Sequence, residues 1–141
     1  MKAINNELND RKVILSTVWI FATVNYIFCD VITLMNPEDL KNILSGTVGA
    51  IKMNQEFLLG AAIMMEIPFV MILLSRVLKY KINRWANIIG AFIMTTVQAS
   101  SFFIGTDSTL HYKFFSIVEI GCTLFVLWYA WTWTMPNEDN T

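Results

Sequence analysis

The hydrophobic positions of this chain fall into four long blocks that are separated by polar segments. The blocks cover approximately residues 13–35, 57–77, 85–105 and 112–134. Each block is close to the length of about 20 apolar residues that a helix needs to cross a bilayer core. The pattern predicts an all-α fold, namely a four-helix transmembrane bundle in antiparallel, up-down order, with residues 1–141 as a single integral membrane domain.

The polar segment after the first block, residues 36–56, carries helix signals of its own. Asn36 is a suitable N-cap, Pro37 fits the first helical position, and leucine and isoleucine then recur at helical spacing. Gly46 offers a stop. We therefore expect a short amphipathic helix in the first outer loop, and we favour a surface connector over a lid on the bundle.

Composition agrees with a membrane location. Hydrophobic residues make up 55% of the chain and charged residues 15%, whereas a typical soluble domain has about 25% charged residues. The first block is longer than the apolar core of a signal peptide and no cleavage pattern follows it, so we expect a retained span. The basic connection at 76–84 is interpreted as a topology signal, and no nucleic-acid partner is expected.

The distribution of positive charge predicts the orientation. Seven of the ten Lys and Arg residues lie in the N-terminal segment or in the connection between the second and third blocks. Because such residues favour the cytoplasmic side, both termini are expected in the cytoplasm. The five tryptophans, Trp19 among them, lie toward the same ends of the blocks and are expected at the lipid headgroups.

Each block also carries a polar side chain in its outer half. Asp30, Gln98 and Glu119 lie roughly 7–10 Å deep and Glu66 roughly 14 Å deep, at a helical rise of about 1.5 Å per residue. Related depths on four helices predict one polar cavity that opens to the outside. The alternative is that each side chain only bonds a neighbouring helix.

No lysine or arginine lies deep enough in the blocks to pair with these acids. An unpaired buried carboxylate takes up a proton or finds a cation, so we expect Glu66 to be neutral at rest and hydrogen-bonded to Asn25, Tyr26 or Gln98. The candidate ligand-binding residues are Asn25, Tyr26, Asp30, Glu66, Gln98 and Glu119.

Several chemistries are disfavoured. Cys29 and Cys122 are single thiols without a C-x-x-C pair, which argues against a thiol oxidoreductase. The single histidine, His111, cannot provide paired haem ligands. No phosphate-binding loop, hydrolase or metalloprotease motif is present, so the sequence assigns no metal site, no cofactor and no catalytic residue.

Two stretches, "EIPFVMILLSRVLKYKINRWANIIGA" (66–91) and "VEIGCTLFVLWYAWTW" (118–133), resemble an uncharacterised bacterial family of small four-span membrane proteins. The architecture is similar to that of DoxX-like proteins and, more remotely, to the sterol-isomerase class, in which embedded acids line a lipophilic pocket. The resemblance implies a bacterial cytoplasmic membrane and a corresponding role for Asp30, Glu66 and Glu119.

These observations favour a non-catalytic membrane protein whose outward-facing acidic pocket binds a lipophilic or cationic small ligand. One alternative is an enzyme that acts on a lipid or isoprenoid, with one carboxyl group as acid and a second as base. Another is an accessory subunit whose acids face a partner's helices. A transport role would require a homo-oligomer. Two acids beside one cavity would favour the enzyme, whereas acids on the outside of the bundle would favour the subunit.

Overall fold

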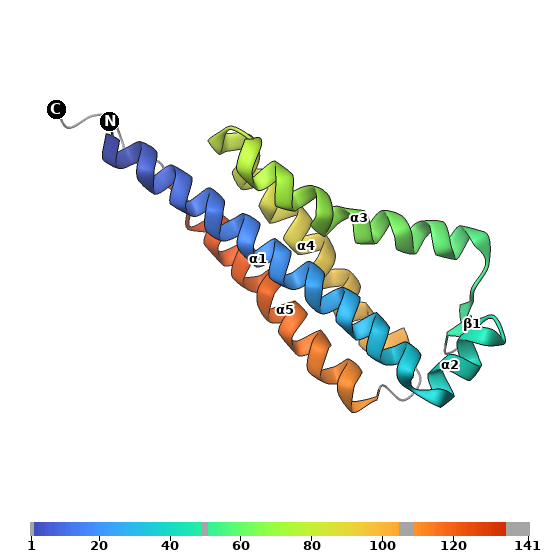
Figure 1. Cartoon of the computed structure of the whole chain (residues 1–141). Helices are drawn as coiled ribbons and strands as arrows, with labels where there is room; N and C mark the ends of the chain where they lie inside the picture. The colour runs from blue at the N-terminus through green and yellow to red at the C-terminus, as the bar shows by residue number, and fades with distance from the viewer. Residues whose placement is uncertain (1, 49–50, 105–108, 135–141) are drawn as a thin grey trace.

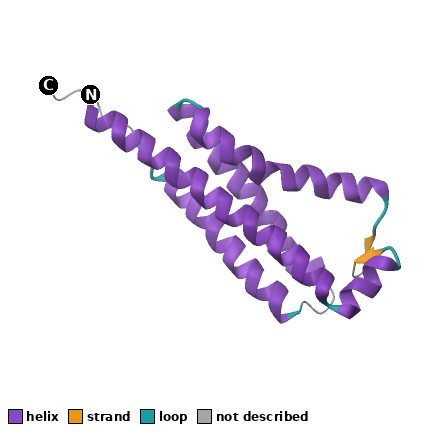
Figure 2. Ribbon diagram, in the orientation of Figure 1, coloured by secondary structure: helices purple, strands orange, loops and turns teal. Residues whose placement is uncertain are grey.

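The computed structural model describes residues 2–48, 51–104 and 109–134 of the chain. These residues form five helices and a small hairpin (Figures 1 and 2). The elements are α1 (Lys2–Met35), α2 (Pro37–Leu44), β1 (Thr47–Val48), β2 (Ile51–Lys52), α3 (Gln55–Val77), α4 (Tyr80–Ile104) and α5 (Leu110–Trp131). The predicted all-helical class is confirmed, and the four predicted blocks correspond to α1, α3, α4 and α5.

In the part of the chain that the structure describes, three helices are long and apolar enough to cross a membrane, which indicates an integral membrane protein. They are α1 from Asn6 to Met35, α3 and α5. The fourth long helix, α4, has 25 residues but is not among the three. It carries a series of polar side chains, and most of these bond to α5 or to a backbone carbonyl one turn back on α4 itself.

One end of the bundle is held together by contacts between helix ends. The Tyr80 hydroxyl donates to the backbone carbonyl of Trp133 (2.6 Å), and the Arg84 guanidinium donates to that of Trp131 (3.0 Å). The Arg11 guanidinium lies over the ring of Tyr129 on α5, 5.0 Å from the ring centroid. We call this end the basic end and the opposite end, where α2 lies, the α2 end (Figure 1).

A buried polar cluster joins α1, α3 and α4 closer to the basic end. The Trp19 indole donates to the side-chain oxygen of Asn87 (2.7 Å), which also accepts from Ser75 (3.2 Å). Asn87 donates to the side chain of Asn83 (2.7 Å), and Asn83 donates to the Ser75 carbonyl (2.7 Å). All four side chains are buried, so the cluster fixes the α3–α4 hairpin against α1.

The expected headgroup position of the tryptophans is therefore wrong for Trp19. Its ring is fully buried and satisfies its N–H through Asn87. Trp133 is also buried, edge-on to Tyr80. The remaining three, Trp85, Trp128 and Trp131, are each more than half exposed, as interfacial rings would be.

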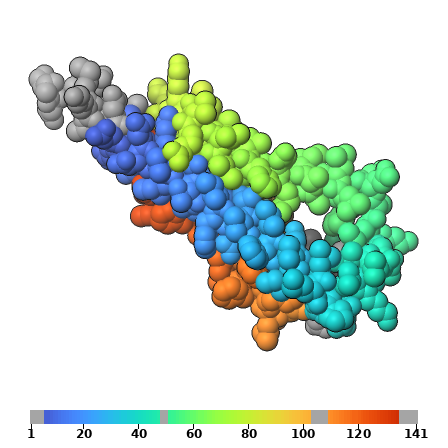
Figure 3. Space-filling view, viewed as in Figure 1, coloured from blue at the N-terminus to red at the C-terminus, as the bar shows by residue number. Residues whose placement is uncertain are grey.

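α3 contains Pro68, and the N-terminal half of α3, before Pro68, leaves the bundle. Figure 1 shows the half of α3 nearest α2 diverging from α1 and α4. Figure 3 shows the surface hollowed between that half and the C-terminal part of α1. Proline removes one helical hydrogen bond and commonly bends a helix. Close packing occurs instead at Gly90, where an added Cβ would lie 3.4 Å from Met71.

The short helix expected in the segment after the first block is confirmed as α2. The Asn36 side chain accepts from the Glu38 backbone N–H (3.2 Å), and Pro37 is the first helical residue. Gly46 follows in the left-handed region at φ 79°, which favours glycine. The pairing of β1 with β2 was not predicted, because two-residue strands leave almost no periodic signal.

We predict that Asn87→Leu lowers the stability of the purified protein. The substitution keeps a similar size but leaves the Trp19 N–H and the Ser75 hydroxyl without a partner, at about 1–3 kcal/mol for each buried group. Asn25→Leu is the matched control, because Asn25 is half-buried and donates only to the Phe21 carbonyl of its own helix (2.8 Å).

Thermal unfolding in detergent measures both variants, and the Tm should fall by roughly 5 °C or more for Asn87→Leu. An equal change in the two variants would show that the buried cluster does not hold the bundle together.

Candidate functional site

The face of α5 that meets α4 is polar at regular spacing. Tyr112, Ser116, Glu119 and Thr123 follow one another every three or four residues, which is the repeat of one helix face. Ser116, Glu119 and Thr123 are buried. This face is therefore a polar seam inside an apolar protein.

Hydrogen bonds cross this seam between α4 and α5, and we call them the polar ladder. Its rungs run from Tyr112 to Ser101 (2.7 Å), from Gln98 to Ser116 (2.8 Å) and from Thr95 to Thr123 (2.7 Å). Each rung satisfies side chains that would otherwise lie unpaired in an apolar surrounding. The ladder explains how α4 accommodates its polar residues.

Glu119 lies between two rungs but takes part in none. Its side chain is 1% exposed, and its Oε1 has no hydrogen-bond partner among the described residues. The hydroxyl of Tyr26, on α1, is likewise buried without a partner, and the two residues are close enough to interact electrostatically. An unsatisfied buried polar group costs about 1–3 kcal/mol of folding stability. The burial of Glu119 and Tyr26 therefore destabilises the fold, so their position needs another explanation than stability.

Two further side chains, those of Arg11 and Arg84, have a buried nitrogen without a partner in the described parts of the chain. Both lie at the basic end, where headgroups and water are within reach of long side chains. Glu119 lies at the middle of α5, and Tyr26 lies in the apolar part of α1, nine residues from its end at Met35. Among the described residues, these two are therefore the buried unsatisfied groups that lie away from the basic end.

Other groups lie on the α2 side of this pair. Asp30 is exposed, one turn beyond Tyr26 on α1, which places a second acid on this side of Glu119. Further out, the ring Nε2 of His111 lies 3.3 Å from the Thr33 hydroxyl. The polar path from His111 past Asp30 to Glu119 thus follows the α1–α5 interface.

The six predicted site residues divide into three groups. Glu119, Tyr26 and Asp30 come together between α1 and α5. Gln98 lies beside them but is bonded to Ser116. Asn25 and Glu66 stand apart, since Asn25 bonds its own helix and Glu66 is exposed on α3.

The expected hydrogen bond from Glu66 to Asn25, Tyr26 or Gln98 is wrong. Glu66 contributes instead to a separate surface groove together with its α3 neighbours Ile63 and Val70. The error arose because depth along a helix does not fix the direction of the side chain. Glu66 lies about 160° around the helix from the buried Pro68, so it points away from the bundle.

An apolar groove lies next to Glu119 on the side of the basic end. It has a volume of about 450 Å³ and runs between α1 and α5. An added Cβ on Gly121 would meet no atom within 4 Å, so the missing side chain leaves the groove open. Its lining residues are Thr17, Val18, Phe21, Val118, Gly121, Cys122 and Phe125.

Sequence reasoning missed the residues that surround the site. The ladder partners Thr95, Ser116 and Thr123 were not singled out, although Ser116 and Thr123 recur at regular spacing with Glu119 on α5. A search for polar residues recurring every three or four positions along the fourth block would have found Ser116 and Thr123. Within residues 2–48, 51–104 and 109–134, no three His, Cys, Asp or Glu side chains gather as a metal site.

Fold and site together define an all-helical integral membrane protein with a buried, unpartnered acid between α1, α4 and α5. The chain belongs to the family described as "Family of unknown function (DUF6326)", whose model matches residues 1–140. The resemblance to an uncharacterised family is thereby confirmed. No curated protein and no solved structure matches the chain.

We predict that Glu119→Met does not lower the Tm of the unliganded protein and instead raises it. Methionine has a similar volume, and it removes a buried polar group that has no partner. Ser116→Ala is the contrasting variant, because it takes the acceptor from Gln98 and should destabilise by about 0.6 kcal/mol.

Thermal unfolding of the two variants beside the wild type makes the comparison. A fall in Tm for Glu119→Met that exceeds the fall for Ser116→Ala would mean that Glu119 is a structural residue.

Proposed function

We propose that this protein is a four-span membrane bundle that binds a lipophilic small molecule with one cationic or hydrogen-bonding group. Glu119 receives that group, Tyr26 adds a hydroxyl, and Asp30 lies on the outward side of the site. The observation that carries the proposal is the pair of buried, unpartnered polar groups on Glu119 and Tyr26. Every other polar side chain on the α4–α5 seam described above has a bond.

The chemistry of the site supports this class of ligand. No lysine or arginine lies between Lys12 and Met35 of α1 or between Phe114 and Trp131 of α5, so no internal cation neutralises Glu119. An ionised Glu119 would pair with an amine, and a neutral Glu119 would bond a hydroxyl or carbonyl oxygen. The adjacent α1–α5 groove is open and apolar, so it offers a surface along which an alkyl chain can lie.

The proposed topology has four antiparallel spans with both termini in the cytoplasm. Support comes from the basic end, which gathers the N-terminal part of α1, the α3–α4 turn and the end of α5 (Figure 1). Positive residues concentrate there, at Arg76, Lys79, Lys81 and Arg84 in particular. With this orientation, Asp30 and His111 lie toward the outside. The DoxX-like architecture and a bacterial cytoplasmic membrane belong to the same proposal.

A second candidate is carboxyl acid–base chemistry on a lipid or isoprenoid. It is favoured by one observation, the presence of a second acid, Asp30, one turn beyond Tyr26 on the α2 side of Glu119. An acid and a base on the two sides of a bound substrate are the minimum requirement of such a reaction. In this case Glu119→Gln would still bind the substrate but would not convert it.

The experiment measures binding of two matched probes, dodecylamine and dodecanol, to the purified protein by native mass spectrometry and thermal shift. We expect Glu119→Gln to weaken binding of the preferred probe about 10-fold or more, because a bond to a charged group contributes about 1.5–3 kcal/mol. Preference for the amine identifies a cation site, and preference for the alcohol identifies a neutral acid.

Glu66→Gln is the matched control. It makes the same chemical change on α3, outside the α1–α5 interface, and should leave probe binding unchanged. Equal binding of both probes to wild type and Glu119→Gln would refute the proposal, as would the absence of any bound probe or co-purified molecule in the wild type.

A further inference from the structure

Glu66 occupies the least favourable position that α3 offers to an acid. It lies eleven residues from Gln55 and eleven from Val77, at the midpoint of the helix. If α3 spans the bilayer, Glu66 is about 16 Å from either end and therefore at the membrane centre. An ionisable side chain at that depth is costly and almost always faces protein or a wet cavity.

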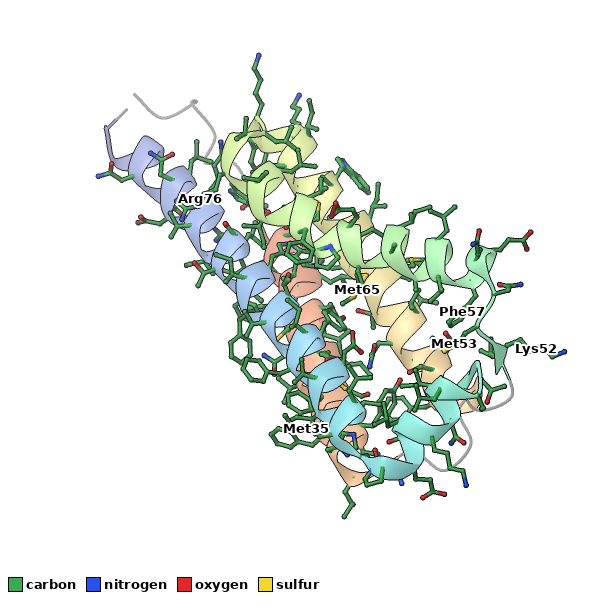
Figure 4. The ribbon with its side chains drawn as sticks, turned by 45° about the vertical axis from the view of Figure 1, so that its right-hand side comes forward. Met35, Lys52, Met53, Phe57, Met65 and Arg76 are labelled. Carbon is green, nitrogen blue, oxygen red and sulfur yellow. The ribbon has the colours of Figure 1, made fainter. Side chains whose placement is uncertain are left out.

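The bundle itself does not cover Glu66. The buried residues Pro68, Met71 and Ser75 mark the side of α3 that packs on the other helices. Met65 also packs against the core, and Figure 4 shows it on the side of α3 that faces the other helices. Glu66 lies about 140–160° around the helix from Pro68 and Met71, and its side chain is exposed.

The surface around Glu66 has the shape that accepts a side chain from another helix. A groove of about 240 Å³ follows Ile63, Glu66, Ile67 and Val70, with Met71 at its edge. The first four are residues i, i+3, i+4 and i+7 of one helix, which is the set that forms a hole for a knob in helix–helix packing.

α3 is also the span with the least contact inside the chain. Only 11% of its apolar window is buried, against 28% for α1 and for α5. Gly60, one turn from Ile63, has no atom within 4 Å of an added Cβ. Glycine weakens a helix unless close approach requires it, and no described part of this chain makes such an approach.

We propose that α3 forms a symmetric, parallel dimer with α3 of a second copy of this chain, in which Glu66 bonds Glu66 of that copy. Two copies related by an axis along the membrane normal carry the same residue at the same depth, so the two acids meet when the Glu66 face of α3 lies at the axis. Two neutral carboxyl groups satisfy each other through a pair of O–H···O bonds. A different partner would need a polar residue at this one depth, whereas a second copy supplies it by symmetry.

This dimer is independent of the Glu119 site and of what that site binds. It assigns Glu66 to association between copies, which separates the roles of two acids that the sequence had placed together.

Disulfide crosslinking in native membranes tests the interface. In a Cys29→Ala, Cys122→Ala background, Ile63→Cys and Val70→Cys should crosslink readily between copies. Leu58→Cys is the matched control, since Leu58 is 48% exposed and Ile63 59%, yet Leu58 lies about 140° around the helix from Ile63. It should crosslink weakly.

Glu66 variants test the role of the acid. Glu66→Gln keeps a donor and an acceptor and should preserve the dimer, whereas Glu66→Leu should weaken association about 3- to 20-fold, the range of single hydrogen bonds between membrane helices. Förster transfer between labelled copies in liposomes measures the dimer fraction, and retained probe binding at Glu119 verifies folding.

The proposal is overturned if the wild type remains monomeric in liposomes, or if Leu58→Cys crosslinks as well as Ile63→Cys. It is also overturned if Glu66→Leu associates as tightly as the wild type, because the acid would then have no part in the interface.

Discussion

The constraint that organises this protein is that a polar group surrounded by hydrocarbon must find a hydrogen-bond partner. Asn83, Asn87, Ser75 and Trp19 meet it as a closed cluster, and α4 and α5 meet it through the polar ladder. Among the described residues, Glu119 and Tyr26 carry buried groups without a partner in the interior, and Glu66 is exposed at the middle of α3. We infer that the first pair awaits a ligand and the last a second copy of the chain.

The two ends of the bundle differ for the same reason. At the basic end, Tyr80 and Arg84 bond backbone carbonyls at the close of α5, and Gly90 lets α4 approach Met71. Toward the α2 end, the half of α3 before Pro68 turns away, so the other helices lack α3 as a neighbour there (Figures 1 and 3). The helices are thus bonded to one another at the basic end, whereas α3 separates from them toward the α2 end. Glu119 lies between these two ends.

The sequence predicted the long helices and the capped helix α2 because apolar blocks and cap residues are local signals. It also singled out Glu119 and Asp30 as candidates, since acids are rare in spans, whereas Tyr26 was expected only as a partner of Glu66. It failed where direction around a helix mattered. Glu66 has a depth suited to the cavity but points away from it, and Trp19 lies toward the basic end but is buried against Asn87. Only the packing of α3 and α4 against α1 decides those directions.

The central claim is that Glu119 has no hydrogen-bond partner among the described residues and receives a ligand instead, and infrared difference spectroscopy tests it most directly. The spectrum of the ligand-free wild type minus that of Glu119→Gln isolates the carboxyl group. Our account predicts a C=O stretch at the frequency of a weakly hydrogen-bonded carboxylic acid, which shifts when a hydroxyl ligand binds and disappears when an amine ligand binds. A band of a strongly hydrogen-bonded or ionised carboxyl group, unchanged by any ligand, would contradict it and make Glu119 a structural residue.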